Sequence, residues 1–289
     1  MIIWIASYPK SGNTWIRSML SYYLYSEDGK FEFNLLNKIP QFPLQKHFKS
    51  FTNKFWDIDE ISKYWILAQE TINLNNKLNF LKTHHANVVY NNYRFTNEDN
   101  CLAAIYVVRD PRNVVMSLSN HFSLSIDQSK KFLFSPTRKV KELIKREWNN
   151  QTDIFKILGN WAEHYKSWKN YKRNVLIIRY EDLLENTNST FLKIIKFLSN
   201  YMDISFNEEK IKKTIEVTSF DKLKNLENQF GFPEAVNLKN EKGEDIKNMS
   251  VKFFNKGKSN DWKKLLDKNI ASEIELKFNS ELKELKYLD

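Results

Sequence analysis

The chain has 289 residues, of which 42% are hydrophobic and 15% aromatic, and its formal net charge is +10. This composition allows a substantial core and excludes a disordered chain. The positive charge favours an anionic ligand, with nucleic acid, acidic lipid and a small polyphosphate all open on that ground. The single cysteine, Cys101, excludes an intramolecular disulfide and, within an apolar run, indicates a buried thiol in a reducing compartment.

The first residues, MIIWIA, are too short for a signal-peptide core, and no apolar run is long enough to predict a membrane span. We therefore expect a cytoplasmic protein. Residues 2–6 predict a buried strand, and apolar side chains at helical spacing predict a helix from Asn13 to Tyr25. Scattered aromatic residues across 26–60 predict loop and short helix, which either line an apolar pocket or pack a long connection onto the core.

Further strands are predicted at 78–85, at 101–110 and at 174–184, the last running into a turn. Helices are predicted over the segments 111–122, 151–170, 187–200, 207–217 and 271–288. The polar stretch 231–250 is predicted to be a mobile loop. Short buried strands that alternate with helices indicate a single α/β domain over 1–289, with a central parallel sheet flanked by helices.

The first strand runs into the segment YPKSGNTW, from Tyr8 to Trp15. Main-chain N–H groups of such a turn, backed by a helix N-terminus, bind an anion, and Lys10 adds a positive charge. The segment differs from the nucleotide-kinase loop GxxxxGK[ST], because its lysine precedes Gly12 and Pro9 stands where a glycine would be. It therefore predicts an anion site of another kind.

The second strand ends in Lys82-Thr83-His84-His85. A histidine can act as a general base near neutral pH. Adjacent side chains on a strand point to opposite faces, so at most one of these histidines faces the site, and a structural role is open for either. No HxxxH or CxxC spacing accompanies them, and no metal site is predicted.

Two further segments carry positive charge. The third strand ends in Arg109-Asp110-Pro111-Arg112, and Ser117 follows on the next helix, so that the arginine and the hydroxyl can clamp a second phosphate. Near the C-terminus, FFNKGKSNDWK (253–263) combines charge with a glycine that permits close backbone approach. Taken alone, this last segment is equally well a solvated loop.

Together these segments resemble the cytosolic-type sulfotransferases, which have a P-loop NTPase-like fold and use 3′-phosphoadenosine-5′-phosphosulfate (PAPS); we expect a bacterial member. YPKSGNTW resembles their 5′-phosphosulfate loop, RDPRNVVMS their 3′-phosphate element and KTHH their Lys-Thr-His segment. FFNKGKSNDWK is similar to their late Arg-Lys-Gly-x-x-Gly-Asp-Trp-Lys motif. The matches follow the family order from residue 4 to residue 263.

The resemblance implies in-line transfer of a sulfuryl group from PAPS to a hydroxyl or amine of a small-molecule acceptor, without a metal. His84 would be the general base, Lys10 would stabilise the departing phosphate, and Lys82 would stabilise the transferred group or orient the acceptor. Ser117 would hold Lys10 off the bridging oxygen until the acceptor binds. The donor-binding residues that the resemblance implies are Lys10, Ser11, Gly12, Asn13, Thr14, Trp15, Arg109, Ser117, Tyr180, Thr218, Ser219, Phe220, Phe254, Asn255, Lys256 and Gly257.

Two residues depart from the family pattern. Asn255 replaces the arginine that contacts the 3′-phosphate, which removes a charge-assisted contact worth a few kcal/mol at most. Asn260 replaces the second glycine. The other predicted contacts retain donor recognition with weaker affinity, or with help from Lys258. The family's dimerisation segment is not recognisable after Lys263, so a monomer and a weak homodimer are both open.

Three alternatives remain. A metal-dependent P-loop phosphotransferase would need magnesium and an acidic residue such as Asp110. A catalytically silent relative that binds adenosine bisphosphate or nucleic acid fits the charge, although the basic residues are scattered and Lys10 and His84 are both present. A lyase or dehydratase is possible on the same site. The aromatic residues of 31–56 and the segment 121–150 would flank an acceptor, which suits a phenol, an alcohol, a lipid, a natural product or an acidic glycan.

Overall fold

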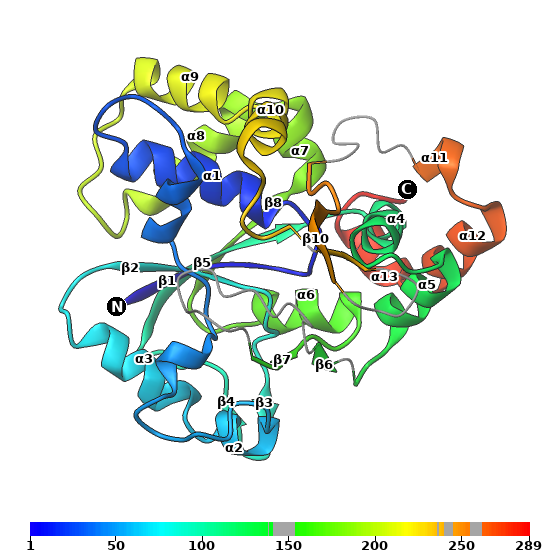
Figure 1. The fold of residues 1–289 in the computed structure, drawn as a ribbon, viewed down its shortest axis with the longest axis horizontal. Helices are drawn as coiled ribbons and strands as arrows, with labels where there is room; N and C mark the ends of the chain where they lie inside the picture. Colours follow the sequence, from blue (N-terminus) through cyan, green and yellow to red (C-terminus); the bar gives the residue numbers. More distant parts are fainter. Residues whose placement is uncertain (138, 141–153, 236, 240–244, 255–261) are drawn as a thin grey trace.

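A parallel sheet runs through the middle of this computed structural model, which describes residues 1–289 except 138, 141–153, 236, 240–244 and 255–261 (Figure 1). Its strands lie in the order β2-β1-β5-β8. They are β1 (Ile2–Ser7), β2 (Asn79–Thr83), β5 (Cys101–Val108) and β8 (Asn174–Arg179). The register places Ile5 beside Lys82 on one side and Ile105 on the other. Since all neighbouring pairs are parallel, the carboxyl ends of the strands meet at one edge.

Helices cover both faces of the sheet, and for this reason the two inner strands, β1 and β5, are almost entirely apolar (Figure 1). On one face lie α1 (Asn13–Tyr25), α8 (Thr187–Leu198), α9 (Glu208–Val217) and α10 (Phe220–Phe230); on the other lie α3 (Trp65–Asn73) and α6 (Trp161–Lys169). Ile3 and Ile5 belong to the core on the α1 face, whereas Trp4 and Ala6 belong to the core on the α6 face. The predicted α/β class with a central parallel sheet is confirmed.

Two helices that follow strands begin where the sequence predicts. Helix α1 starts at Asn13, directly after Gly12, whose φ of 101° is left-handed. Helix α4 (Pro111–Phe122) starts with proline at its first position, and the Asp110 carboxylate caps it by accepting from the N–H of Arg112 at 2.9 Å. Both helix N-termini therefore lie at the edge of the sheet where the strands end.

The predicted helix over 151–170 is wrong over the described residues 154–160. Residues 151–153 lie outside the described residues, and Lys156–Ile157 form β7, which pairs with β6 (Lys139–Val140). Helix α6 starts only at Trp161, because Asn160 accepts from the N–H of Glu163 at 2.9 Å in a reciprocal capping box. Gly159, at a φ of 66°, turns the chain just before it.

Three other predictions change in detail. Within the loop predicted at 231–250, the described residues form an antiparallel pair, β9 (Asn237–Lys239) and β10 (Asp245–Ser250). The C-terminal helix divides into α12 (Lys268–Lys277) and α13 (Asn279–Glu284), with α11 (Trp262–Leu265) before them. The turn predicted after β8 is a helix, α7 (Tyr180–Glu185).

Residues 26–60 form short helices and loop, as predicted. The short helices are η1 (Phe33–Lys38), η2 (Gln45–His47) and α2 (Ile58–Ser62). Phe42 and Phe48 are fully buried in the core on the α6 face, and Phe31 and Phe33 are buried in the other core. These aromatic residues therefore pack a long connection onto the core. The remaining elements are β3 (Val89–Tyr90), β4 (Tyr93–Arg94) and α5 (Ile126–Phe134).

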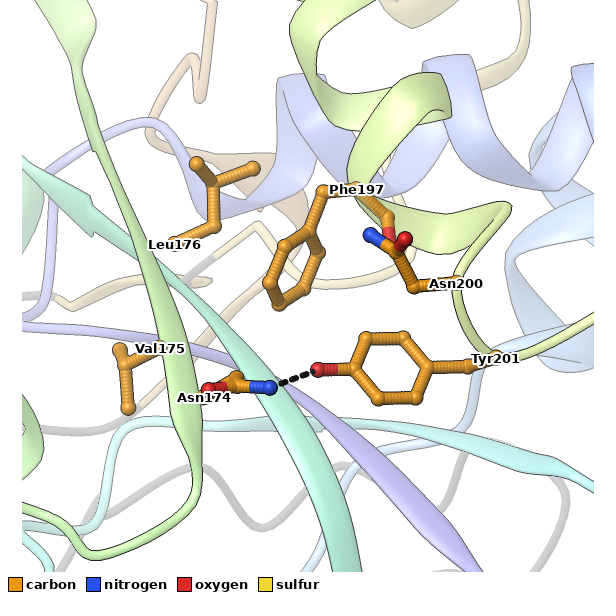
Figure 2. A pocket seen from close by; sticks show the side chains of 6 residues that line it. All are labelled: Asn174, Val175, Leu176, Phe197, Asn200 and Tyr201. Atoms are coloured by element: carbon orange, nitrogen blue, oxygen red, sulfur yellow. Dashed lines mark hydrogen bonds between the residues drawn. The ribbon is translucent and has the colours of Figure 1, made fainter.

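A hollow of about 590 Å³ opens at the start of β8 (Figure 2). Its lining residues are Asn174, Val175, Leu176, Phe197, Asn200 and Tyr201. Asn174 and Tyr201 hydrogen-bond to each other there at 2.7 Å. The hollow lies at the opposite end of the strand from the predicted site. Among the described residues, no helix combines the length and apolar character that crossing a membrane requires.

Candidate active site

The segment after β1 forms a cradle of main-chain N–H groups. Lys10 (φ 66°) and Gly12 (φ 101°) both have left-handed backbone conformations. The N–H groups of residues 11–14 donate to no acceptor within the described residues, and α1 begins directly behind them. Successive amides in such a turn, at the positive end of a helix, bind anionic oxygens. The backbone at YPKSGNTW therefore has the geometry that the predicted anion site requires.

Tyr180 closes one side of this cradle. A Cβ atom built on Gly12 would lie 2.4 Å from Cδ2 of Tyr180, so only glycine fits beside the ring. The Arg109 guanidinium stacks over the same ring at 4.3 Å from its centroid, and Trp15 meets its edge at 5.9 Å between ring centroids. Tyr180 thus packs together the loop and the arginine predicted to bind the donor.

Arg109 is tied to the cradle and retains unused donors. Its Nη1 donates to the main-chain oxygen of Lys10 at 3.2 Å, and its own carbonyl accepts from Nε1 of Trp161 at 3.2 Å. Arg109 is only 7% exposed, yet among the described residues neither its Nε nor the buried hydroxyl of Ser11 has a hydrogen-bond partner. Buried polar groups normally have partners, so these orphaned groups fit an anionic ligand such as a phosphate.

His84 contacts the end of β1 and has a defined tautomer. Its Nδ1 lies 2.9 Å from the main-chain oxygen of Ser7 and 3.2 Å from the Ser7 hydroxyl. A carbonyl oxygen can only accept, so Nδ1 carries the hydrogen and Nε2 carries the lone pair. Ser7 ends β1, three residues before Lys10, so the loop and the histidine share one anchor. The nitrogen of His84 that can take a proton is therefore Nε2.

His164 of α6 fixes the backbone of His84. Its Nε2 donates to the His84 carbonyl at 3.0 Å, and its Nδ1 accepts from the hydroxyl of Tyr106 at 2.9 Å. Complete burial lowers the pKa of His164 to about 4, so this ring is neutral at physiological pH. Tyr106 and His164 thus form a buried chain that ends at the candidate base.

His85 points away from the site, as the alternation along a strand predicts. Its ring stacks on Phe95 at 4.1 Å and meets Trp65 edge-on at 4.7 Å, and its Nδ1 donates to the carbonyl of Ala86 at 2.6 Å. Burial lowers the pKa of His85 to about 3. Trp168 donates to the His85 carbonyl at 2.9 Å. His85 is a core residue.

The three other predicted catalytic side chains have different surroundings. The Lys10 ammonium lies over the ring of Phe253, 3.8 Å from its centroid. The Lys82 ammonium is almost fully buried and bonds to the Glu234 carboxylate at 2.9 Å. Ser117 is half-buried in α4, and its hydroxyl bonds to no other described residue. The structure therefore brings Lys10, Lys82 and His84 to one edge of the sheet.

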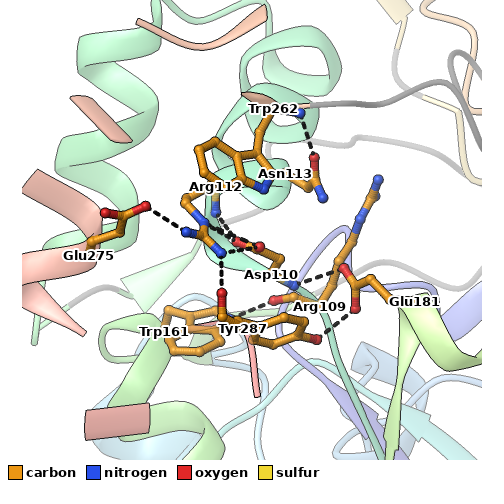
Figure 3. A network of polar contacts seen from close by, with 9 residues as sticks. All are labelled: Arg109, Asp110, Arg112, Asn113, Trp161, Glu181, Trp262, Glu275 and Tyr287. Atoms are coloured by element: carbon orange, nitrogen blue, oxygen red, sulfur yellow. Dashed lines mark hydrogen bonds and ion pairs between the residues drawn. The ribbon is translucent and has the colours of Figure 1, made fainter. Parts of the chain in front are cut away.

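A network of polar contacts holds the Arg109 strand end from behind (Figure 3). Glu181 accepts from the N–H of Asp110 at 3.1 Å and from the hydroxyl of Tyr287 at 2.6 Å. Burial raises the pKa of Glu181. Arg112 forms an ion pair with Asp110 at 2.7 Å and donates to the Tyr287 carbonyl at 2.8 Å. Arg112 donates to both carboxylate oxygens of Asp110, which therefore serves as a helix cap and as an ion-pair partner.

Another group of the residues predicted to bind the donor lies beside α1. Nε1 of Trp15 donates to the Thr218 carbonyl at 2.9 Å, while the Thr218 hydroxyl turns back to Thr214 at 2.6 Å. Ser219 precedes α10, and Phe220 packs edge-on against Phe254 at 6.0 Å. Asn255, Lys256 and Gly257, which were also predicted to bind the donor, lie outside the described residues. Lys258 and Asn260 lie outside them too.

Sequence reasoning missed the residues that hold this site in place. Ser7 and His164 orient His84, Glu181 supports the Arg109 strand end, and Glu234 pairs with Lys82. The Glu227 carboxylate accepts from the N–H groups of the adjacent Phe253 and Phe254 at 2.6 and 2.9 Å. Among the described residues, no group of three or more His, Cys, Asp and Glu side chains is placed to hold a metal ion.

The site joins an anion cradle and Arg109, whose Nε has no partner among the described residues, to a histidine whose tautomer places the lone pair on Nε2. Against known sequences, the sulfotransferase domain family model matches residues 2–286. The chain is 25% identical over 285 residues to sulfotransferase 1E1 of Homo sapiens, covering 97% of this chain and 83% of that protein. It is 22% identical to the amine sulfotransferase of Oryctolagus cuniculus, with 98% and 81% covered.

Solved structures share the fold. Retinol dehydratase in complex with androsterone and the inactive cofactor PAP gives a TM-score of 0.58 at 19% identity, covering 98% of this chain and 80% of that chain. The mouse sulfotransferase SULT7A1 complexed with PAP gives 0.57 at 20% identity, covering 97% and 83%. At these identities the likeness shows the fold alone.

Proposed function

The chain belongs to the sulfotransferase domain family and is a PAPS-dependent sulfotransferase, and we propose how its own residues carry out the transfer. The observation that carries the proposal is the anchoring of Nδ1 of His84 to the Ser7 carbonyl, three residues before Lys10. One anchor thereby relates the proton acceptor to the loop that would hold the leaving phosphate. A second supporting observation is the orphaned donors of Ser11 and Arg109.

The 5′-phosphosulfate would be held by the main-chain N–H groups of residues 11–14, by the Ser11 hydroxyl and by Lys10. Arg109 and Ser117 would hold the 3′-phosphate. The adenosine would lie near Trp15, Tyr180 and the segment Thr218–Phe220. Phe254 and residues 255–257 complete the proposed set, the latter from the sequence resemblance alone.

In the proposed reaction, Nε2 of His84 takes the proton from the acceptor hydroxyl while the acceptor oxygen forms a bond to sulfur. The bond between sulfur and the bridging phosphate oxygen breaks, and adenosine 3′,5′-bisphosphate (PAP) leaves. The Lys10 ammonium stabilises the charge that develops on the bridging oxygen. Lys82 orients the acceptor or stabilises the transferred group. No step requires a metal ion.

The Lys10 ammonium lies over the ring of Phe253, 3.8 Å from its centroid. The hydroxyl of Ser117, in α4, has no hydrogen-bond partner among the described residues. We propose that Lys10 moves from this position to the bridging oxygen when the donor binds. Ser117 would restrain it until the acceptor arrives. The proposed acceptor is a small molecule with a hydroxyl, or secondarily an amine, and residues 231–250 would form a lid over it.

We further propose a cytoplasmic location. A relative from Arabidopsis thaliana, 26% identical over 280 residues, is named cytosolic sulfotransferase 13. The free, buried Cys101 is in keeping with a reducing compartment.

Thermal stabilisation tests the donor site. A ligand that binds only the folded state raises the melting temperature once its concentration exceeds its dissociation constant. PAP, AMP and ATP are each compared with and without magnesium. We expect a shift that is largest with PAP and indifferent to a chelator. A shift with ATP and magnesium alone would instead support the phosphotransferase reading. Transfer of labelled sulfate from PAPS to a panel of phenols and alcohols then defines the acceptor.

A further inference from the structure

A buried cluster of three charged side chains lies beside the candidate base. The Glu234 carboxylate bonds to the Lys82 ammonium at 2.9 Å through one oxygen and to Nη1 of Arg17 through the other. The side chains of Lys82 and Arg17 are 5% and 3% exposed, and that of Glu234 is 22% exposed. The remaining Arg17 donors bond to the carbonyls of Ile39 at 2.7 Å and Leu36 at 2.8 Å. Glu234 therefore bridges two cations, of which Arg17 is also held by two main-chain carbonyls.

The cluster faces the same side of the sheet as His84. Lys82 precedes His84 by two residues, and side chains two apart on a strand project to the same face. The Lys82 backbone is held on its outer side, because its N–H donates to the Pro40 carbonyl at 2.9 Å and its carbonyl accepts from Phe42 at 2.8 Å. The backbone from which the Lys82 side chain extends is therefore fixed, and the bond to Glu234 restrains the position of the ammonium group.

Glu234 reaches this position through an aromatic anchor. The residue two before it, Phe232, packs against Phe33 at 4.9 Å and against Phe253 at 4.5 Å between ring centroids. Phe253 is also the ring beneath the Lys10 ammonium. The short segment 231–235 therefore contacts Lys82 directly through Glu234 and packs against the ring on which Lys10 lies.

The charged groups around Lys82 shift its pKa in different directions. Burial lowers the pKa of Lys82 most strongly, and the nearby Arg17 of α1 and Lys156 of β7 lower it further, whereas Glu234 raises it. His84 adds a titratable ring on the same face. Among the described groups that face Lys82, Glu234 is the one that favours the ammonium form. Removal of its charge would leave a buried amine among cations.

We propose that Glu234 is a positioning residue that holds Lys82 as an ammonium ion beside His84. The inference rests on the proposed function, in which both side chains face the acceptor. A protonated Lys82 stabilises negative charge on the transferred sulfuryl oxygens and offers no lone pair, so that His84 is the sole base. A neutral Lys82 would lose the first property and compete for the acceptor proton.

The test follows the ionisation of Lys82 directly. Protein labelled with ¹³C and ¹⁵N in lysine is titrated by NMR through the Cε–Nζ correlations, and the Lys82 signal is identified by its loss in Lys82→Arg. We expect Lys82 to remain an ammonium at pH 8 in the unaltered chain. In Glu234→Gln, its titration midpoint should fall by ~1–3 pH units, as for loss of a close opposite charge.

The matched control is Glu60→Gln, which removes a carboxylate that pairs with the exposed Lys63 at 2.8 Å. This substitution should leave the Lys82 midpoint unchanged. If Glu234→Gln does not fold, Glu234→Asp keeps the charge but shortens the side chain, and a smaller downward shift is expected. A Lys82 midpoint that stays within half a unit in the variant that folds overturns the proposal, as does a neutral Lys82 at pH 7 in the unaltered chain.

Two further measurements separate this inference from the proposed function. PAP should stabilise Glu234→Gln as much as the unaltered chain, since Glu234 pairs with Arg17 and Lys82 and is not among the residues proposed to hold the donor. With 4-nitrophenol as the acceptor probe, Glu234→Gln should lose transfer rate at a lower alkaline pH than the unaltered chain, and an identical pH profile overturns the role of Glu234 in the reaction. If PAP fails to stabilise the unaltered chain, the donor assignment is wrong. The Lys82 titration needs no ligand and would still test whether Glu234 keeps Lys82 protonated.

Discussion

Nδ1 of His84 lies 2.9 Å from the main-chain oxygen of Ser7, so the histidine next to the anion loop presents Nε2 as its basic nitrogen. This relationship fixes the tautomer through a carbonyl, which no change of pH can turn into a donor. The orientation of the base therefore depends on the backbone of β1. It would survive substitution of the Ser7 side chain better than displacement of the strand.

The two adjacent histidines should respond differently to substitution. His84→Ala and Lys10→Ala should lower the transfer rate by about 10²-fold or more, because they remove the proposed base and the cation at the leaving oxygen. His85→Phe should transfer sulfate at nearly the normal rate. Rates are measured with labelled PAPS on variants whose circular dichroism is native. Equal losses in all three folded variants would contradict His84 as the unique base.

The stability of His85 variants is a separate matter. The ring is fully buried against Phe95, so His85→Ala would leave a cavity and is expected to cost about 3–5 kcal/mol of unfolding free energy, as for a buried aromatic residue. The substitution is thus mild for chemistry only. His85→Phe fills the same space and avoids this loss, which makes it the better comparison.

Gly12→Ala should disable the anion cradle. Its Cβ would meet Tyr180 at 2.4 Å, and the φ of 101° adds strain on the order of 1–3 kcal/mol. We expect the stabilisation by PAP to disappear. The control is Gly231→Ala, where the φ of 73° is also positive but no atom lies within 4 Å of the added Cβ. PAP stabilisation that is lost equally in both variants would trace the effect to backbone strain in general.

Tyr287→Phe should weaken donor binding without removing any group from the cradle. The substitution deletes the 2.6 Å hydrogen bond to Glu181, whose other oxygen holds the N–H of Asp110. Loss of one buried charge-assisted bond is worth about 1.5–3 kcal/mol, part of which should appear as a ~5–10-fold weaker PAP affinity by calorimetry. Tyr90→Phe is the matched control, since it removes a 2.6 Å bond to Asp59 at the surface. Unchanged affinity in Tyr287→Phe would mean that Arg109 is held without this network.

Asn255→Arg should tighten donor binding, because it restores the charge-assisted contact that the sulfotransferase pattern places there. The residue lies outside the described residues, and this expectation follows from the sequence. An increase of about tenfold in PAP affinity corresponds to one such contact of modest strength. Calorimetry at fixed ionic strength measures it, with Lys258→Arg as a charge-neutral comparison. No change would mean that another group already contacts the 3′-phosphate.

Acid should destabilise the fold through its buried histidines. The folded-state pKa values are about 3 for His85 and about 4 for His164, because burial disfavours the charged rings, whereas the unfolded value is 6.5. Below pH 6.5 the unfolded chain binds more protons, so unfolding free energy is lost as pH falls toward 4, by up to about 1.4 kcal/mol per pH unit for each histidine. Urea unfolding at pH 4.5, 5.5 and 6.5 measures this slope. In His85→Phe, the slope of unfolding free energy against pH should be smaller by the contribution of one histidine.

Much of the fold was predictable because the signals are local. The apolar run of β1 and the helical spacing after Gly12 gave the observed bounds of α1, and Pro111 after Asp110 marked the start of α4. The start of α6 had a signal that was missed, namely the asparagine and glutamate three residues apart at Asn160 and Glu163. Tryptophans at helical spacing suggested a longer helix than the cap allows.

The candidate site was predictable in its strand ends but not in its supports. The alternation of side chains along a strand predicted that His84 and His85, which directly follow β2, point in opposite directions. Glu234 and Lys82 are 152 residues apart in the sequence. The carboxylate of Glu227 likewise accepts from the N–H groups of Phe253 and Phe254, which follow it by 26 and 27 residues. Such pairs depend on how α10 and the following segment return to the sheet. No spacing rule encodes that return.

The order of the strands has a consequence for how the polypeptide reaches its native state. β1 is synthesised first but lies inside the sheet, between β2 and β5, which follow much later. Until they arrive, the apolar segment Ile2–Ser7 has no partner for its main-chain groups on either side. Parallel pairing over such sequence separations makes folding slow and leaves exposed edges open to self-association. We therefore expect refolding yields to fall steeply with protein concentration, and the newly synthesised β1 segment to be a natural target for chaperones.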